Sequence, residues 1–250
     1  MKPSYSPAEM MTVVAARELS DGEVVFVGIG LPNLACNLAR ETHAPELVLI
    51  YESGAVGAVP ERLPVSIGDP ALVTGSLMVC SMADVFQCFL QNGRIQVGLL
   101  GAAQIDRYGN INTTVVGEYI APSVRLPGSG GAAEIAIHAG RIVVIARLDR
   151  RVFRERVDFV TSPGRRAQRH GGSIGSTRVI TDKAVLESDP ESGELVLAAL
   201  YPGVDAAEVA AGVGWELRSL GRLAEVSSPT DQELQLLREV LDPKRLYIKR

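Results

Sequence analysis

Short apolar segments rich in β-branched residues alternate along this chain with segments of helical periodicity, and this alternation is what most restricts its fold. Several of the short segments are apolar almost throughout, as expected for strands covered on both faces. Strands interleaved with helices predict an α/β fold in which helices lie on the faces of a layered sheet. The predicted strands are Glu23–Val27, Glu46–Tyr51, Ile95–Leu100, Asn112–Gly117, Arg141–Arg147, Val157–Thr161, Thr177–Thr181 and Glu194–Ala199.

The helical segments carry boundary signals of their own. Asp205 and Thr230 stand where N-caps are expected, and Asp242-Pro243 ends the last helix. The stretch SDPESGE, between two apolar runs, predicts a hairpin turn. No repeat or long linker divides the chain, so we expect one domain over residues 1–250. The predicted helices are Pro7–Leu19, Pro32–Glu41, Ala83–Asn92, Ala132–Ala139, Ala206–Gly212 and Asp231–Leu241.

Charge and composition exclude several classes of protein. The formal net charge is −4 with both signs interspersed, so no basic stripe is present to bind nucleic acid. No apolar run approaches the ~18 residues of a membrane span, and the N-terminal stretch lacks the apolar region of a signal peptide. The three cysteines form no C-x-x-C pair. We therefore expect a cytoplasmic protein that binds neither nucleic acid nor membrane.

One carboxylate stands out in the stretch LVLIYESGAVG. Glu52 follows a strand-like apolar run directly and precedes small residues and glycines. Ligands of open α/β sheets bind beyond the carboxyl ends of the strands, and Glu52 occupies such an end. Its small neighbours leave room for a bulky substrate, whereas a solvated or paired charge is the simpler alternative.

Two glycine-containing turns could expose backbone N–H groups to a ligand. Gly28 and Gly30 follow a strand and precede a helix, but Asn33 replaces the third glycine of a dinucleotide fingerprint, so a tight turn is an alternative. Gly128, Gly130 and Gly131 could form an anion-holding nest of amides, or a turn that only needs positive φ angles.

The stretch GAAQIDRYGNINTT concentrates hydrogen-bonding side chains, among them Gln104 and Asn110. Such density suits either a buried polar turn that satisfies its own backbone or a loop that faces substrate. Both alternatives remain open from the sequence.

Other catalytic motifs are absent. No His, Cys or Asp spacing resembles a metal site, and neither a G-x-S-x-G elbow nor a P-loop occurs. Cys36 and Cys88 lie in helical segments and are expected in the core. The remaining chemistry is that of a carboxylate nucleophile or base, which is ionised at neutral pH without a histidine.

Taken together, these residues resemble the class I coenzyme A-transferases, specifically the β subunit of the glutaconate CoA-transferase type. The resemblance covers nearly the whole chain in order, and the GAAQIDRYGN and GSGG elements are specific in combination. The matching stretches are GIGLP, YESG, GAAQIDRYGNINTT, PGSGGAAEIA, VDFVTSPG, TDKAVL, LYPGVDAAEV and LREVLDPKR.

The resemblance implies a mechanism and assigns its residues. Glu52 matches the glutamate that attacks an acyl-CoA thioester, giving an acyl–glutamyl anhydride and then a glutamyl-CoA thioester. The glycine pair whose amides lie at the site matches Gly130 and Gly131. The turn beside the substrate matches Gly28, Gly30 and Asn33.

The resemblance also implies a partner and substrates. These are a CoA-transferase α subunit in a heterotetramer or larger assembly, an acyl-CoA and a carboxylic acid, with no bound cofactor and no metal. The basic cluster Arg165, Arg166 and Arg169 is either a solvated loop or a phosphate contact. Relatives on this scaffold leave two alternatives: a CoA-thioester hydrolase or lyase, and a non-catalytic ligand-sensing or structural subunit.

Overall fold

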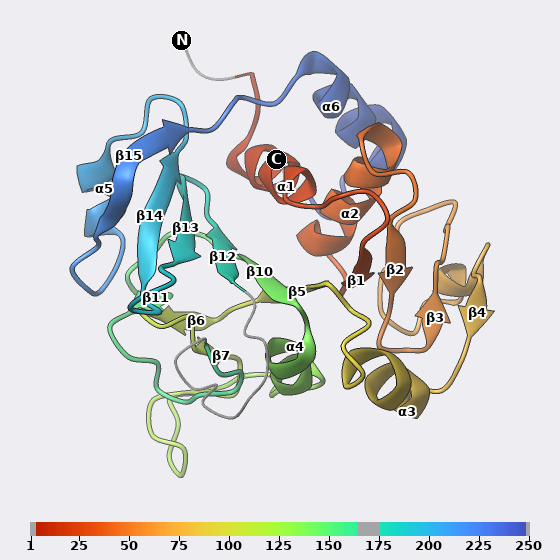
Figure 1. Cartoon of the computed structure of the whole chain (residues 1–250), viewed down its shortest axis with the longest axis horizontal. Coiled ribbons are helices and arrows are strands. Elements are labelled where there is room, and N and C mark those ends of the chain that lie inside the picture. The colour runs from red at the N-terminus through yellow and green to blue at the C-terminus, as the bar shows by residue number, and fades with distance from the viewer. Residues whose placement is uncertain (1–3, 165–175, 249–250) are drawn as a thin grey trace. The chain divides into compact units, whose positions relative to one another are not determined.

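The computed structural model describes residues 4–164 and 176–248, and their contacts gather into two compact units (Figure 1). The first unit comprises residues 1–99 and 228–250, and the second comprises residues 100–227. Whether the chain folds as a single domain over residues 1–250, as the sequence led us to expect, stays a prediction.

A small mixed sheet forms the first unit, with strand order β5-β1-β2-β3-β4. β1 pairs in parallel with β5 and β2, whereas β3 is antiparallel to both β2 and β4. The parallel centre places the ends of β1 and β2 at the same edge of the sheet. The strands are β1 (Val24–Phe26), β2 (Val48–Ile50), β3 (Ala55–Val56), β4 (Met78–Val79) and β5 (Val97–Gly101), the last of which runs on into the second unit.

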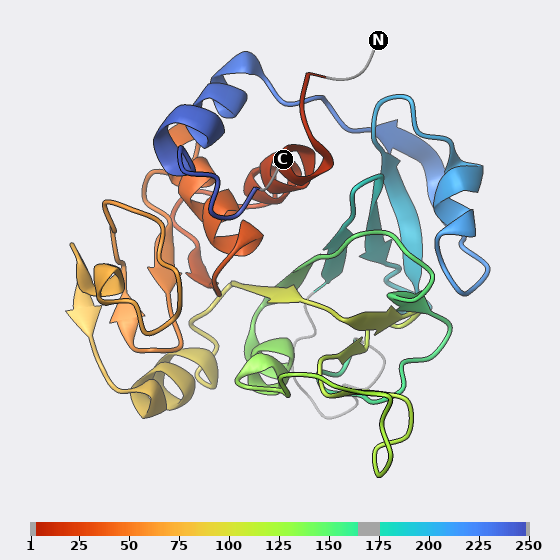
Figure 2. The same ribbon diagram turned by 180° about the vertical axis from the view of Figure 1, so that it is seen from behind.

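Helices α1, α2 and α6 gather beside β1 and β2, as both ribbon views show (Figures 1 and 2). α1 begins with a capping box in which Ser6 and Glu9 each accept from the other's backbone N–H, and Pro7 occupies the first turn. The helical segments of this unit are α1 (Pro7–Arg17), α2 (Leu31–Thr42), η1 (Pro70–Val73), α3 (Met82–Asp84), η2 (Val85–Leu90), α6 (Asp231–Gln235) and η4 (Leu236–Leu241).

The second unit holds a five-stranded sheet with strand order β15-β14-β13-β12-β10. β10 and β12 are parallel, β12, β13 and β14 are successively antiparallel, and β14 is parallel to β15. The strands are β10 (Arg141–Ile145), β12 (Thr177–Ile180), β13 (Ala184–Ser188), β14 (Leu195–Leu200) and β15 (Ser219–Glu225).

Two smaller sheets and two short helices complete the second unit. One small sheet has the order β11-β6-β7 and the other pairs β8 with β9. The elements are β6 (Gln104–Asp106), β7 (Ile111–Asn112), β8 (Val115–Val116), β9 (Val124–Arg125), β11 (Phe153–Arg154), α4 (Ala132–His138) and α5 (Ala206–Ala211).

The α/β fold class predicted from the sequence is confirmed, and all six predicted helices are present within a few residues of their expected bounds. Thr230 and Asp205 cap their helices as expected. The SDPESGE stretch connects the antiparallel strands β13 and β14.

Three local expectations were wrong. The segment Asn112–Gly117 divides into β7 and β8, because Asn112 Oδ1 accepts from the N–H groups of Thr114 and Val115 and turns the chain between them. Val157–Thr161 forms no strand; Ser162, just beyond it, makes a single bridge to Ile111. Cys36 is buried as expected, but Cys88 is exposed on its helix.

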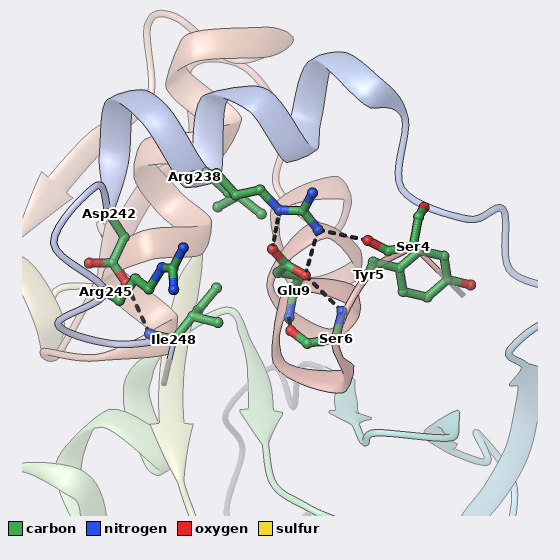
Figure 3. Close-up of a pocket in the computed structure, with 9 residues that line it drawn as sticks. Ser4, Tyr5, Ser6, Glu9, Arg238, Asp242, Arg245 and Ile248 are labelled. Carbon is green, nitrogen blue, oxygen red and sulfur yellow. Dashed lines mark hydrogen bonds and ion pairs between the residues drawn. The ribbon is translucent and has the colours of Figure 1, made fainter. Parts of the chain in front are cut away.

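The N-terminal and C-terminal helices of the first unit are joined by two ion pairs, of which Figure 3 shows the one between Glu9 and Arg238. Arg238 Nε lies 2.6 Å from Glu9 Oε1, and Arg17 Nη2 lies 2.7 Å from Glu233 Oε2. Burial raises the pKa of Glu9 and the hydrogen bond from Arg238 lowers it, with the pKa below its usual 4.5 as the result. The charged form of Glu9 therefore stabilises the folded chain.

Replacing this carboxylate should lower stability in a pH-dependent manner. Because the folded pKa is depressed, the contribution is present above pH 4.5 and is lost as the pH falls through the folded pKa. Glu9→Gln should cost about 1–3 kcal/mol at pH 7 and progressively less below pH 4.5. Urea unfolding at several pH values measures this, with Glu239→Gln, whose exposed carboxylate accepts from Gln235, as control. A cost that does not depend on pH would contradict this role.

Candidate active site

Glu52 lies at the tip of a tight turn between β2 and β3 in the first unit, where it is half-buried. The Gly54 N–H donates to the Tyr51 carbonyl at 2.9 Å, and the Tyr51 N–H donates to the Ala55 carbonyl at 3.0 Å. These two bonds close the backbone around Glu52 and Ser53. Glu52 therefore lies just beyond the end of a strand, as the sequence predicted.

Gly54 has no room for a side chain, and this packing fixes the turn. Its φ is +107°, and a Cβ atom there would lie 1.9 Å from the Cys80 carbonyl oxygen. The Cys80 N–H in turn donates to the Gly54 carbonyl at 3.0 Å. The Glu52 turn is thus held against the chain that enters α3.

A methyl group at this position should damage the fold. We expect Gly54→Ala to lower the free energy of unfolding by more than about 2 kcal/mol, because a left-handed backbone and a clash with Cys80 add together. Gly93→Ala is the matched control, since Gly93 has φ +68° with open space around it, and should cost only about 1–2 kcal/mol. Equal losses in denaturant titrations would show that the Cys80 contact does not hold the turn.

The glycine turn before α2 also lies in the first unit. Gly30 is the N-cap residue of α2, with φ +97° and no side-chain cap, and Pro32 occupies the first helical turn. A Cβ added to Gly28 would meet nothing within 4 Å. The turn therefore leaves open space at Gly28, as expected for a backbone that a ligand can approach.

Asn33 and Tyr51 form a buried contact that the sequence did not reveal. Both residues are 0% exposed, and Asn33 Nδ2 donates to the Tyr51 hydroxyl at 2.6 Å. This bond brings the first turn of α2 to the residue that precedes Glu52. The expected substrate contact of Asn33 stays a prediction, because the structure shows its side chain engaged inside the first unit.

The C-terminal segment contributes a second tyrosine that sequence reasoning missed. Asp242 accepts from the N–H groups of three residues that follow it and folds the segment back. The Tyr247 hydroxyl then donates to the Pro64 carbonyl. Burial raises the pKa of Tyr247 to about 12, and a hydrogen bond from the Gly30 N–H opposes that rise. The C-terminal segment is therefore bonded to the loop at Pro64 in the same unit.

Gly130 and Gly131 lie in the second unit, at the start of α4. Gly130 is exposed with φ +46°, a Cβ there would meet nothing within 4 Å, and Gly131 is the N-cap residue of the helix. Within residues 4–164 and 176–248, no acceptor pairs with the N–H of either glycine. The Gly130 amide is thus exposed and unpaired, whereas Gly131 is unpaired but buried.

Neighbouring threonines anchor the glycine turn. Thr113 Oγ1 donates to the Gly128 carbonyl at 2.8 Å, and the Gly128 N–H donates to the Thr113 carbonyl at 2.8 Å. Thr161 Oγ1 accepts from the Thr113 N–H at 2.9 Å and lies 2.6 Å from Thr114 Oγ1. The motifs GAAQIDRYGNINTT, PGSGGAAEIA and VDFVTSPG are therefore joined by hydrogen bonds.

Removing one hydroxyl should loosen this turn locally. Thr113→Val keeps the side-chain shape, and we expect it to cost about 1 kcal/mol of stability and to speed amide exchange at Gly128. Hydrogen exchange with mass spectrometry measures both effects. Ser123→Ala, which deletes a comparable bond to the Val116 carbonyl, is the control and should leave exchange at Gly128 unchanged. Unaltered exchange in Thr113→Val would mean that Thr113 does not anchor the turn.

Gln104 and Asn110 take part in internal networks of the second unit. Gln104 is 2% exposed; its amide donates to Asp158 Oδ2 at 2.8 Å and accepts from Asn112. Asn110 donates to both carboxylate oxygens of Asp106 and accepts from the Gly164 N–H. These contacts are those of a polar turn that satisfies its own backbone. A direct contact with substrate stays a prediction.

No further feature that the structure describes adds a residue to the candidate sites above. The Arg165, Arg166 and Arg169 cluster lies outside the described residues. A pocket of about 320 Å³ beside the start of α1 contains none of the predicted site residues (Figure 3).

In the described part of the chain, no group of three or more His, Cys, Asp or Glu side chains could hold a metal ion. Among the same residues, no helix is long and apolar enough to cross a bilayer.

Comparison with known proteins identifies the family to which the chain is similar. The family model described as "Coenzyme A transferase" matches residues 8–212. A 3-oxoadipate CoA-transferase subunit from Pseudomonas knackmussii is 47% identical over 241 residues, covering 94% of this chain and 93% of its own. The crystal structure of glutaconate coenzyme A-transferase from Acidaminococcus fermentans superposes with a TM-score of 0.92 at 31% identity, covering 99% of this chain and 98% of the other. The structure of the decarboxylase AibA/AibB gives a TM-score of 0.85 at 28% identity, covering 97% of each chain.

The chain therefore belongs to the coenzyme A transferase family, and within it to the type represented by the β subunits of class I enzymes. The resemblance first read from YESG, GAAQIDRYGN and GSGG is confirmed.

Proposed function

We propose that this chain is the β subunit of a heteromeric CoA-transferase in which Glu52 is the nucleophile. The observation that carries the proposal is the Glu52 turn: a half-buried carboxylate stands at the end of β2 on a backbone fixed by Gly54. Support comes from two relatives, one named as a subunit of 3-oxoadipate CoA-transferase and the other as glutaconate CoA-transferase. The partner is then an α subunit.

The proposed reaction begins with attack of a Glu52 carboxylate oxygen on the carbonyl carbon of an acyl-CoA. The C–S bond breaks, CoA leaves as a thiolate, and an acyl–glutamyl anhydride remains. The thiolate attacks the glutamyl carbonyl and releases the acyl group as a free carboxylate, which leaves Glu52 as a CoA thioester. The acceptor acid reverses these two steps and departs as the new acyl-CoA. One thioester replaces another, so the exchange is close to isoenergetic and requires no external energy source or bound cofactor.

The N–H groups of Gly130 and Gly131 are the proposed oxyanion donors. They are backbone donors without a partner among the described residues, and removing one such donor typically costs about 2.7–4 kcal/mol of transition-state stabilisation. Gly28, in the same unit as Glu52, contributes backbone beside which a Cβ would meet nothing within 4 Å. The CoA moiety supplies binding energy remote from the reacting carbonyl.

The names of the relatives also suggest the class of acid. 3-Oxoadipate and glutaconate are both dicarboxylic acids, and we extend that class to the acid exchanged by this protein. A lyase or hydrolase in which Glu52 activates water is the second candidate, because the decarboxylase AibA/AibB shares the fold.

A covalent adduct on Glu52 tests the proposal. The chain, co-purified with its α partner, is incubated with 3-oxoadipyl-CoA, glutaconyl-CoA or acetyl-CoA, and peptide mass spectrometry searches for CoA on the fragment that contains Glu52. We expect an adduct that disappears when a dicarboxylic acid is added, and none in Glu52→Ala.

The controls separate the candidates. Glu61→Ala, which removes an exposed carboxylate from the same unit, should form the adduct as the parent does. Steady loss of acyl-CoA without an adduct or an acceptor would favour the hydrolase or lyase. An adduct that persists in Glu52→Ala would place the nucleophile elsewhere.

A further inference from the structure

The backbone that carries Glu52 depends on Tyr51 at two points. The carbonyl of Tyr51 accepts the bond that closes the turn at Gly54, and its N–H donates to Ala55 across the base of the turn. A shift of Tyr51 would therefore displace both backbone hydrogen bonds that close the turn around Glu52. No comparable side-chain hydrogen bond to Glu52 itself is present in the described part of the chain.

The side chain of Tyr51 is fixed by a chain of amides from α2. Asn37 Nδ2 donates to the Asn33 carbonyl at 2.8 Å and to Asn33 Oδ1 at 3.1 Å. This leaves Asn33 Nδ2 turned toward the Tyr51 hydroxyl, to which it donates at 2.6 Å. Two of these residues lie one turn apart on α2 and the third directly follows β2, so the bonds join the helix to the turn of Glu52.

Asn33 and Tyr51 are closed off from solvent, unlike Glu52. Asn33 and Tyr51 are both 0% exposed, whereas Glu52 is half-buried. A polar pair in a closed interior is costly to leave unmatched, and here each partner satisfies the other. A hydrocarbon pair of similar shape would fill the same space without a directional bond, so the hydrogen bond adds orientation rather than packing.

We propose that Asn33 and Tyr51 act together as positioning residues that hold the turn of Glu52 in its reactive place. This rests on the proposed function of Glu52. Both side chains are fully buried, and in this role they act through the backbone bonds at Gly54 and Ala55. A misplacement of about 1 Å can lower a rate by about a hundredfold, which sets the scale of the effect.

The test combines hydrogen exchange at the Gly54 amide, which does not require catalysis, with the rate of adduct formation on Glu52, which does. In Tyr51→Phe, hydrogen exchange at the Gly54 amide should become faster, because the turn loses its anchor. With the α partner present, the single-turnover rate of CoA-adduct formation on Glu52 should fall by about tenfold to a hundredfold, with little change in KM. Tyr5→Phe, which deletes an exposed hydroxyl bond to Ser228 in the same unit, should alter neither.

A double variant separates positioning from stability. Tyr51→Phe alone leaves the Asn33 amide buried and unpaired, whereas Asn33→Leu combined with Tyr51→Phe removes both partners. We expect the double variant to recover the stability of the parent while its adduct rate stays low. Recovery of the rate together with stability would assign the pair a structural role only, and overturn the proposal.

The remaining outcomes are also decisive. Unchanged exchange at Gly54 in Tyr51→Phe would overturn the proposal whatever the activity. Faster exchange with a parental rate would overturn it as well. If the parent itself forms no adduct, the proposed function fails, and faster exchange at Gly54 would then support only the anchoring of the turn.

Discussion

The contact between Gly54 and the Cys80 backbone is the constraint on which the candidate site of the first unit depends. At that point the chain between β2 and β3 lies so close to the chain entering α3 that a Cβ atom would overlap a carbonyl oxygen. Because the approach is backbone to backbone, no rotamer change can relieve it. The turn therefore has one available path, and Glu52 stands at its tip. A carboxylate on a flexible loop would lose part of its reactivity to disorder.

The glycine turn of the second unit is fixed by a different means. Gly130 and Gly131 have amides without an acceptor among the described residues, but Gly128 is bonded twice to Thr113, which is bonded in turn to Thr161. Threonine side chains thus fix the turn that carries these two amides. In each unit, the backbone of the candidate residues is fixed by contacts with neighbouring residues: the Cys80 backbone beside Gly54 and the Thr113 side chain at Gly128.

Much of the fold and part of the site could be predicted from the sequence. The apolar runs predict the longer strands, and cap residues predict the helix starts, because both depend on neighbours in the chain. The wrong predictions concern segments whose structure depends on residues far away in the chain. Val157–Thr161 is β-rich in composition, yet the Asp158 N–H bonds to the Gln104 side chain, which interrupts any ladder. Cys88 has a helical neighbourhood like that of Cys36, yet its side chain is exposed after folding.

The sequence by itself determined the family, through an order of motifs that matches it, and it marked the candidate residues: a strand-end glutamate and two glycine turns. Those features are local, since each depends on residues that are neighbours in the chain. Only the tertiary structure decided that Asn33 is a buried partner of Tyr51 and that the Tyr247 hydroxyl donates to the Pro64 carbonyl, 183 positions away in the chain. Burial and hydrogen-bond partners depend on which surfaces meet after folding, and no spacing of residues in a sequence specifies them.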